Sequence, residues 1–410
     1  MKDEGGDVKF SANAEPSRER KRAVELGLSM PSFYEFFAGG GMARAGLGEE
    51  WECLFANDND AKKAAGYAAN WGDRHLTVAD VGALTAADLP GRADLAWASF
   101  PCQDLSLAGA CAGLRGRRSG TVWPFWRLMR ALAAEGRAPS IVVLENVCGA
   151  LTSHGGEDFA AIGAALAEGE YRFGAVVMDA VRFLPQSRPR LFIVGVHGRR
   201  ALPASVVAAG PDPLWHPSHL AGAQEKLSPR SQAAWVWWKL PEPAPRTSTF
   251  SESIEDPPRG VVWHTAAETA RLLSLMAPLH RRKVEIAKSA GLRMFGAIYK
   301  RTRTDENGNS VQRAEVRFDG VSGCLRTPVG GSSRQSVLVV EGRRVRSRLL
   351  SPREAARLMG LPDSYRLPEN YNEAYHLAGD GVAVPVVRFL ADRLLEPLLA
   401  AGGESGIMSR

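Results

Sequence analysis

The feature that most constrains the fold is a regular alternation of apolar runs and amphipathic segments that begins at residue 32. Apolar runs typical of buried strands cover residues 33–37, 51–57, 75–78, 94–100, 141–144 and 191–196. Helical spacing covers residues 42–50, 61–71 and 124–135 between them. This order predicts an α/β fold with a doubly wound, mainly parallel sheet, because a helix between two strands lets the second strand run parallel to the first. Ligands of such sheets bind at the carboxyl ends of the strands.

The alternation stops near His197 and returns after Val340. Residues 200–340 are rich in proline, tryptophan and basic residues and show no such order, which predicts a second, smaller and irregular domain. We expect Trp235, Trp237 and Trp238 in its core. These changes in sequence pattern predict four parts: a polar N-terminal extension over residues 1–30, a first domain over 31–199, the irregular domain over 200–340 and a C-terminal segment over 341–410.

Two helices are expected in the C-terminal segment. Ser351, Pro352 and Glu354 predict a helix start, with serine as the N-cap, proline in the first turn and glutamate completing a capping box. Apolar spacing predicts a last helix over residues 384–399. A short helix over residues 17–26 and a disordered tail are equally compatible with the polar N-terminal extension.

Composition places the chain among globular proteins of reducing compartments. Hydrophobic residues make up 45% and charged residues 23% of the sequence, and the formal net charge is +6. This basic excess is compatible with a polyanionic partner. Five scattered cysteines argue against a disulfide framework, and none has the spacing of zinc ligands, so we expect no metal. No signal peptide and no apolar run of about 18 residues is visible, which predicts a cytoplasmic protein.

Small and acidic residues follow three strands in succession. Gly39 and Gly41 lie between the first strand and its helix, where glycine lets a ligand approach the backbone. Asp58 ends the second strand and suits ribose hydroxyls, whereas Asp80 ends the third and suits an adenine amino group. Taken separately, each residue is more typical of a tight turn or a solvated loop. Together they predict an adenosine site, and S-adenosylmethionine fits better than NAD or ATP because neither a GxGxxG pattern nor a Walker lysine is present.

Reactive side chains follow other strands of the same predicted sheet. Cys102 comes after a buried run, and Glu145 ends another, where burial favours its protonated form. Arg188 and Arg190 stand one residue apart just before the run at 191–196. Alone, these residues are typical of a buried thiol, an ion-paired carboxylate and surface charges. In one sheet, they suit nucleophilic attack by a thiolate, with an acid and guanidinium groups to stabilise the charge that develops on the substrate.

The same residues form ordered blocks that resemble those of the DNA (cytosine-5) methyltransferases of bacteria and phages. The blocks are Phe37-Ala38-Gly39-Gly40-Gly41, Phe100-Pro101-Cys102-Gln103, Glu145-Asn146-Val147, Gln186-Ser187-Arg188-Pro189-Arg190 and Gly379-Asp380-Gly381-Val382-Ala383-Val384-Pro385. The resemblance covers residues 32–196 and 349–399. It implies a Rossmann-like, S-adenosylmethionine-dependent methyltransferase sheet, a variable target-recognition domain in the middle, and a C-terminal segment that folds back onto the first domain.

The resemblance also implies roles for individual residues. Cys102 is expected to be the nucleophile and Glu145 the partner of the ring nitrogen, while Arg188 and Arg190 line the target pocket. The residues expected to hold S-adenosylmethionine are Phe37, Ala38, Gly39, Gly41, Asp58, Asp80, Val81, Pro101, Asp380, Gly381 and Val382. Two positions depart from the family's pattern: Met42 stands where glycine is frequent, and Asp380 where asparagine is common. We hypothesise that the Asp380 charge attracts the sulfonium centre; unchanged affinity and turnover in Asp380→Asn would contradict this.

Access to a paired cytosine requires flipping it out of the duplex, and several segments suit this task. Residues 105–120, rich in glycine and arginine, suit a closing loop. The basic run at 280–304 and the turn at 305–309 predict a hairpin between residues 294–304 and 311–318, although a charge run is as often a solvated face. The residues expected to contact DNA are Gln103, Ser106, Arg115, Arg117, Arg118, Gln186, Lys300, Arg301 and Arg303.

The leading hypothesis is therefore a methyltransferase that acts on cytosine in a specific sequence of double-stranded DNA. An RNA cytosine methyltransferase of the same fold and a catalytically inactive DNA-binding protein are the alternatives. The large basic middle domain favours DNA over RNA, and the intact Cys102, Glu145 and arginine pair argue against inactivity. A restriction endonuclease acting on the same site is a possible functional partner, and a monomer is the simplest expectation.

Overall fold

The computed structural model describes residues 30–101, 114, 119–198, 200–304, 308–326 and 334–401. They form two compact units. The larger unit holds residues 30–178, 189–243 and 382–401, and the smaller holds Asp179–Arg188 and Ala244–Gly381. The chain therefore passes between the units more than once. These units differ from the predicted domains, since residues 200–243 group with the larger unit and residues 341–381 with the smaller.

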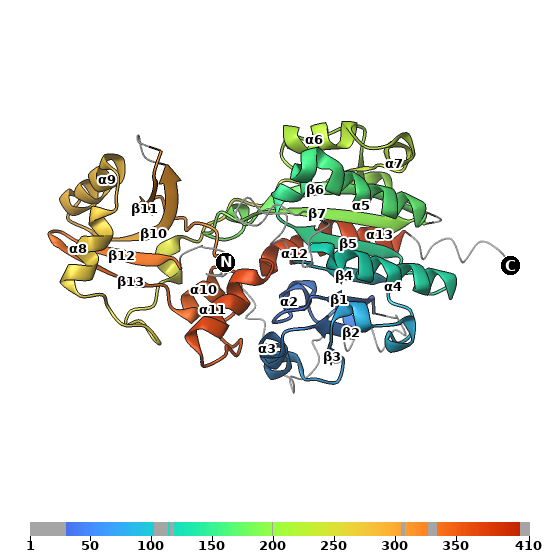
Figure 1. Ribbon diagram of the computed structural model, residues 1–410, viewed down its shortest axis with the longest axis horizontal. Coiled ribbons are helices and arrows are strands. Elements are labelled where there is room, and N and C mark those ends of the chain that lie inside the picture. The colour runs from blue at the N-terminus through green and yellow to red at the C-terminus, as the bar shows by residue number, and fades with distance from the viewer. Residues whose placement is uncertain are drawn as a thin grey trace, which may run out of the picture. The chain divides into compact units, whose positions relative to one another are not determined.

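A seven-stranded sheet forms the centre of the larger unit (Figure 1). Its order is β3-β2-β1-β4-β5-β7-β6, and β3, β2, β1, β4 and β5 run parallel. The α/β fold with a mainly parallel sheet is thus confirmed, with one addition: β7 runs antiparallel to β5. The strands are β1 (Ser32–Phe36), β2 (Glu52–Asp58), β3 (Leu76–Val78), β4 (Leu95–Ala98), β5 (Ile141–Asn146), β6 (Tyr171–Asp179) and β7 (Pro189–His197).

Helices complete the core of the larger unit. Helices α4 (Val122–Ala134) and α5 (Glu157–Glu168) pack on alternate residues of β1, β4 and β5, such as Tyr34, Ala96 and Val142, in one hydrophobic cluster. Helix α2 (Met42–Leu47) begins at the buried Met42 and packs against α12 (Val384–Leu390) from the end of the chain. The other helices of this unit are α3 (Ala61–Trp71), α6 (Ser218–Glu225), α7 (Pro229–Ala233) and α13 (Glu396–Ala400).

The tryptophan-rich segment belongs to the larger unit, so the expectation that it forms the core of the smaller domain is wrong. Trp237 and Trp238 form β9, which pairs antiparallel with β8 (Val207–Ala208). Trp238 is fully buried, and its indole N–H donates to the backbone carbonyl of Val194 in β7 at 3.3 Å. The large apolar ring of Trp238 is therefore buried against the seven-stranded sheet and not in the smaller unit.

The smaller unit is built on a four-stranded antiparallel sheet in the order β11-β10-β12-β13. Its strands are β10 (Arg293–Thr304), β11 (Ser310–Arg317), β12 (Ser336–Glu341) and β13 (Arg344–Leu349), and the predicted basic hairpin is confirmed as β10 and β11. Helices α8 (Ala266–Ser274) and α9 (Pro278–Ser289) cover one face, where Leu272, Val284 and Ile298 share a core. In the part of the chain that the structure describes, no helix is long and apolar enough to cross a membrane.

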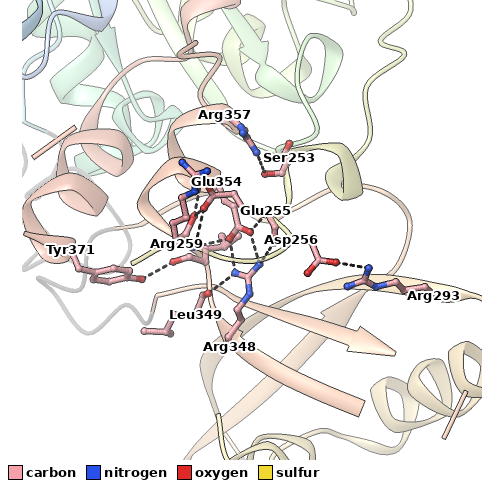
Figure 2. A network of polar contacts seen from close by, with 12 residues as sticks. Ser253, Glu255, Asp256, Arg259, Arg293, Arg348, Leu349, Glu354, Arg357 and Tyr371 are labelled. Carbon is pink, nitrogen blue, oxygen red and sulfur yellow. Dashed lines mark hydrogen bonds and ion pairs between the residues drawn. The ribbon is translucent and has the colours of Figure 1, made fainter. Parts of the chain in front are cut away.

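A buried ion pair ties β13 to the next helix. Helix α10 (Pro352–Arg357) begins with the predicted capping box, in which Ser351 accepts from the Glu354 N–H. Figure 2 shows Arg348 and Glu354 at the centre of a polar network, and both side chains are fully buried. Glu354 also accepts from the Glu255 N–H at 2.8 Å. Because each charge has lost its water, the pair depends on these added hydrogen bonds. Helix α11 (Tyr371–Asp380) follows.

Candidate active site

The turn between β1 and α2 takes an unusual backbone conformation. Phe37, Gly39 and Gly41 have φ angles of 56°, 55° and 74°, in the left-handed region. Glycine adopts this region without penalty, whereas Phe37 stores local strain that its surroundings must offset. The Ala38 N–H donates to the Asn57 carbonyl at 2.9 Å, which ties the turn to the end of β2. The turn is therefore held in one shape by its neighbours.

The two glycines at 39 and 41 meet different surroundings. A Cβ at Gly41 would lie 2.3 Å from the indole nitrogen of Trp71, so packing excludes any side chain there. That indole N–H donates to the Gly40 carbonyl at 3.0 Å. A Cβ at Gly39 would meet no atom within 4 Å. Trp71 thus packs against the turn at Gly41, whereas the space at Gly39 is open. A ligand that approaches the backbone of the turn needs such an open position.

Acidic residues stand at the ends of β2 and β3 as predicted. Asp58 is buried, and its carboxylate accepts from the Gly39 N–H at 2.8 Å and from the Asp60 N–H at 2.9 Å. Asp80 is exposed and caps a short 3-10 helix by accepting from the Gly82 N–H at 2.7 Å. Val81 beside it is buried in the hydrophobic cluster. The sheet therefore brings together the glycine turn, a carboxylate bonded to it and an exposed carboxylate.

This arrangement fits an adenosine-type cofactor. The space over Gly39 lets a ligand approach the backbone, and carboxylate oxygens retain further acceptor capacity for hydroxyl or amino groups after accepting one hydrogen bond each. Phe37 is half-buried at the start of the turn, which leaves part of its ring for contact. The donor and acceptor types at this edge of the sheet are those that a neutral nucleoside needs.

Strands β4 and β5 run side by side, and a side chain at the end of β5 holds the backbone that follows β4. The Asn146 amide at the end of β5 donates to the Phe100 carbonyl at 3.0 Å, in a buried contact. The side-chain oxygen of Asn146 accepts from the Val147 N–H at 2.8 Å, so both the nitrogen and the oxygen of the amide group are held by hydrogen bonds. Phe100 and Pro101 lead directly to Cys102, which lies outside the described residues. Asn146 is not among the site residues predicted from the sequence. The signal that could have identified it is its place in the Glu145-Asn146-Val147 block.

Glu145 and Arg190 form an ion pair inside the larger unit. The guanidinium Nε of Arg190 lies 3.3 Å from a carboxylate oxygen of Glu145, and the two side chains are 15% and 8% exposed. Arg190 comes next to Leu191, which pairs with Asn146 across β5 and β7. The antiparallel course of β7 thus places an arginine beside the acid at the end of β5. The fold thus brings together two charged groups that lie far apart in the sequence.

Arg188 lies in different surroundings, within the smaller unit. It is 2% exposed, and its guanidinium donates to the carbonyls of Leu325, Gly379 and Gly381 at 3.0, 2.8 and 2.7 Å and to the Cys324 sulfur. Gln186 is also buried, with its amide on the Leu358 carbonyl and its oxygen on the Leu325 N–H. Both side chains thus donate mainly to backbone carbonyls of the smaller unit.

The remaining predicted cofactor residues lie at the end of α11. Asp380 is the last residue of this helix, and Gly381 ends it in an extended conformation. Gly379 and Gly381, on either side of Asp380, both accept hydrogen bonds from Arg188. Gly381 is the last residue of the smaller unit, and Val382 starts the final segment of the larger unit.

The predicted DNA-contacting residues of the hairpin share one acidic partner. Arg303 donates from Nε to a Glu315 oxygen at 3.0 Å, and Arg301 lies 3.6 Å from the other oxygen. The Arg301 guanidinium also stacks 4.7 Å from the centre of the Tyr299 ring. Lys300 is half-buried and pairs with Ala314. Of the other expected DNA contacts, Gln103, Ser106, Arg115, Arg117 and Arg118 lie outside the described residues, as does the region of the possible N-terminal helix.

Comparison with known proteins points the same way as this geometry. Residues 32–396 match the family model of the C-5 cytosine-specific DNA methylases. Among curated proteins, the Type II methyltransferase M.HpaII of Haemophilus parainfluenzae is 25% identical over 90% of both chains. M1.ScrFI of Lactococcus lactis subsp. cremoris is 28% identical over 89% of this chain and 78% of the relative.

Solved structures share the fold. The methyltransferase EhMeth of Entamoeba histolytica aligns with a TM-score of 0.55 and 14% identity, over 91% of this chain and 98% of its own. The Dnmt2 methyltransferase of S. pombe aligns with a TM-score of 0.51 and 17% identity, over 90% and 99% of the two chains.

Proposed function

Because the chain belongs to the C-5 cytosine-specific DNA methylase family and transfers a methyl group from S-adenosylmethionine to carbon 5 of cytosine in DNA, we propose that Cys102, Glu145 and Arg190 perform the chemistry. One observation carries this assignment. The Glu145–Arg190 ion pair adjoins Asn146, whose amide holds the Phe100 carbonyl two residues before Cys102. The acid at the end of β5, the cation at the start of β7 and the segment after β4 that leads to a thiol are thus linked by these contacts.

Cys102 is the nucleophile in this proposal. Its thiolate forms a bond to carbon 6 of the cytosine ring, which turns carbon 5 into an enamine carbon able to accept a methyl group. Loss of the proton from carbon 5 and departure of the thiolate then restore the ring. The hydrogen bond from Asn146 to Phe100 fixes the backbone before the cysteine, so the thiol is delivered from a defined point.

Glu145 and Arg190 stabilise the charge that this attack creates. Addition at carbon 6 places negative charge on the ring, and the Glu145 carboxyl group offsets it by holding a proton at ring nitrogen 3 through a hydrogen bond. Arg190, 3.3 Å from Glu145, is in reach of the same ring edge and suits the base oxygen. Arg188, by contrast, is directed to backbone carbonyls, which does not support its predicted contact with the base or a phosphate.

The glycine turn and the residues at the strand ends would hold S-adenosylmethionine, which supplies a methyl group activated by a sulfonium centre. Phe37, Ala38, Gly39 and Gly41 form the turn, and Asp58 and Asp80 offer carboxylates at the next two strand ends. Val81 and Pro101 flank these positions. We also assign Asp380, Gly381 and Val382 to the cofactor, from their match to the family's last block alone.

Double-stranded DNA with one flipped cytosine is the substrate that we propose. The β10–β11 hairpin supplies Arg301 and Arg303 for the grooves or the backbone. Gln103, Ser106, Arg115, Arg117, Arg118 and Lys300 are further contacts by the same proposal. A monomer in the cytoplasm, alone or beside a restriction endonuclease of the same site, remains the expectation from the sequence.

Bisulfite sequencing of plasmid DNA from cells that express the chain tests this function. We expect protected cytosines in one recurring sequence context, and none in cells that express Cys102→Ala. Methylation by Cys102→Ala or Cys102→Ser would contradict the role of the thiolate. Cytosines unprotected by the wild-type chain would point instead to RNA or to an inactive binder, and titration with S-adenosylmethionine would then separate the two.

A further inference from the structure

Arg188 and Arg190 are one residue apart, yet the structure gives them different partners. Arg190 pairs with a carboxylate, whereas the guanidinium of Arg188 donates to three carbonyl oxygens and one sulfur of described residues. We infer that Arg188 is a positioning residue that fixes the turn at Gly379–Gly381, and not a contact of the target base. The inference rests on the proposed function, since that turn is assigned to S-adenosylmethionine.

The end of α11 depends on this guanidinium. The last carbonyls of a helix have no partner within the helix and carry its negative partial charge. One nitrogen of Arg188 donates to the carbonyls of Gly379 and Gly381, at 2.8 and 2.7 Å. Because these two residues flank Asp380, the contacts fix the backbone on both sides of it. A cation is a favourable group here, since it satisfies the acceptors and opposes the helix dipole.

The other guanidinium nitrogen reaches a second segment of the smaller unit. It donates to the Leu325 carbonyl at 3.0 Å, while the Leu325 N–H donates to Gln186 at 3.0 Å. Both polar groups of the Leu325 backbone are thus bound by side chains of the short segment Asp179–Arg188. That segment is itself anchored, because the Arg188 N–H donates to the Asp179 carboxylate at 2.6 Å. Arg188 therefore joins the Leu325 backbone to the turn after α11.

Only a planar, forked cation meets these requirements. The guanidinium carries donors on separate nitrogens in fixed geometry, whereas the lysine ammonium is a single point charge. Contact of either terminal nitrogen with a flipped base would require Arg188 to give up hydrogen bonds to buried carbonyls, which each cost free energy when left unsatisfied. The same geometry predicts that Arg188 acts before DNA arrives, by preparing the turn for the cofactor.

Titration of the wild-type chain and of variants with S-adenosylhomocysteine, without DNA, tests this inference. We expect Arg188→Lys to weaken binding about tenfold, as loss of roughly one charge-assisted hydrogen bond implies. Gln186→Met is the matched control, because it loses the Leu325 contact but does not touch the turn, and its affinity should stay within about twofold of wild type. Unchanged affinity in Arg188→Lys, or an equal loss in Gln186→Met, would overturn the inference.

A second comparison separates positioning from base contact. Duplexes carrying either cytosine or an abasic site at the target position are compared, in the sequence identified by bisulfite sequencing. The difference in affinity between them should be the same in Arg188→Lys as in wild type and should change in Arg190→Lys. A changed difference in Arg188→Lys would assign this arginine to the base.

The wild-type chain provides a test that no folding defect can disturb. Phenylglyoxal, followed by peptide mapping, should modify Arg190 and leave Arg188 unmodified until the chain unfolds. Reaction of Arg188 at the rate of Arg190, with protection by DNA, would overturn the inference. Failure of the wild-type chain to methylate DNA would instead contradict the proposed function, so the two are distinguishable.

Discussion

At the scale of single residues, a buried acid beneath the glycine turn makes stability depend on pH. Glu35 in β1 is 1% exposed, and burial raises its pKa from 4.5 to about 8, although hydrogen bonds from the α2 backbone and the charge of Arg44 act against the rise. One carboxylate oxygen accepts from the Arg44 N–H at 3.3 Å, and the other has no hydrogen-bond partner within the described part of the chain. The folded chain therefore favours the protonated acid.

The sign of the effect follows from this raised pKa. The contribution to stability is fully present below pH 4.5, where both the folded and the unfolded chain hold the proton, and it is lost progressively as pH rises from there through about 8. We expect urea denaturation of wild type to show a free energy of unfolding that falls by a few kcal/mol between pH 5 and 9, since one pKa unit corresponds to about 1.4 kcal/mol. Glu35→Gln should remove this part of the decline. Parallel curves for the two chains would contradict the prediction.

At the scale of elements, the β10–β11 hairpin holds its arginines in fixed positions through one acid. Burial by itself would raise the pKa of Glu315. Hydrogen bonds from Arg303 and Tyr299 and the charge of Arg301 outweigh this effect, so the pKa lies below its usual value. The carboxylate therefore stays charged and orders both arginines. In Glu315→Gln, we expect stronger binding to non-specific DNA with a steeper dependence on salt, because released arginines neutralise phosphates.

The same variant should lose discrimination between specific and non-specific duplexes, by about tenfold if one ordered contact is lost. Fluorescence anisotropy at several salt concentrations measures both quantities. Asp363→Asn is the matched control, since it removes one acidic partner of an arginine, Arg357, away from the hairpin. An equal effect in both variants would show that net charge alone is responsible.

At the scale of the whole molecule, the end of the chain is part of the larger unit's core. Val387 of α12 packs against Gly46 of α2, and Trp51 donates to Glu396 at 2.9 Å. The last helices bury the side chains of Val386, Val387, Leu390, Leu394, Leu395 and Leu398. At about 1.5–3 kcal/mol each, their burial contributes on the order of 10 kcal/mol, which is comparable with the total stability of a typical protein.

A chain that ends at Gly381 is therefore expected to show no cooperative thermal transition of the larger unit. Addition of a separate peptide of residues 382–401 should restore it, because the binding surface on α2 remains in the sequence. Calorimetry measures both. A transition within a few degrees of the full-length chain, without the peptide, would show that the larger unit folds without its last helices.

Much of this structure is predictable from the sequence, for reasons that differ by feature. The strands, the capping box at Ser351 and the pairing of β10 with β11 follow from local periodicity and turn chemistry, which act over a few residues. The antiparallel direction of β7 and the burial of Arg188 do not, because they depend on contacts between distant segments. Periodicity does not encode strand direction. The sequence around Arg188 likewise does not indicate that backbone carbonyls of distant segments surround its guanidinium.

The two-part composition of the smaller unit, which carries the hairpin that we propose to contact DNA, bears on how chimeras of it should be built. A transplant of residues 244–381 into another scaffold would leave Gln186 and Arg188 behind, and with them the partners of Leu325, Gly379 and Gly381. The smallest transferable cassette is therefore discontinuous and includes Asp179–Arg188. Chimeras built at the 243/244 and 381/382 junctions alone would carry the β10–β11 hairpin without the side chains that hold the backbone at Leu325, Gly379 and Gly381.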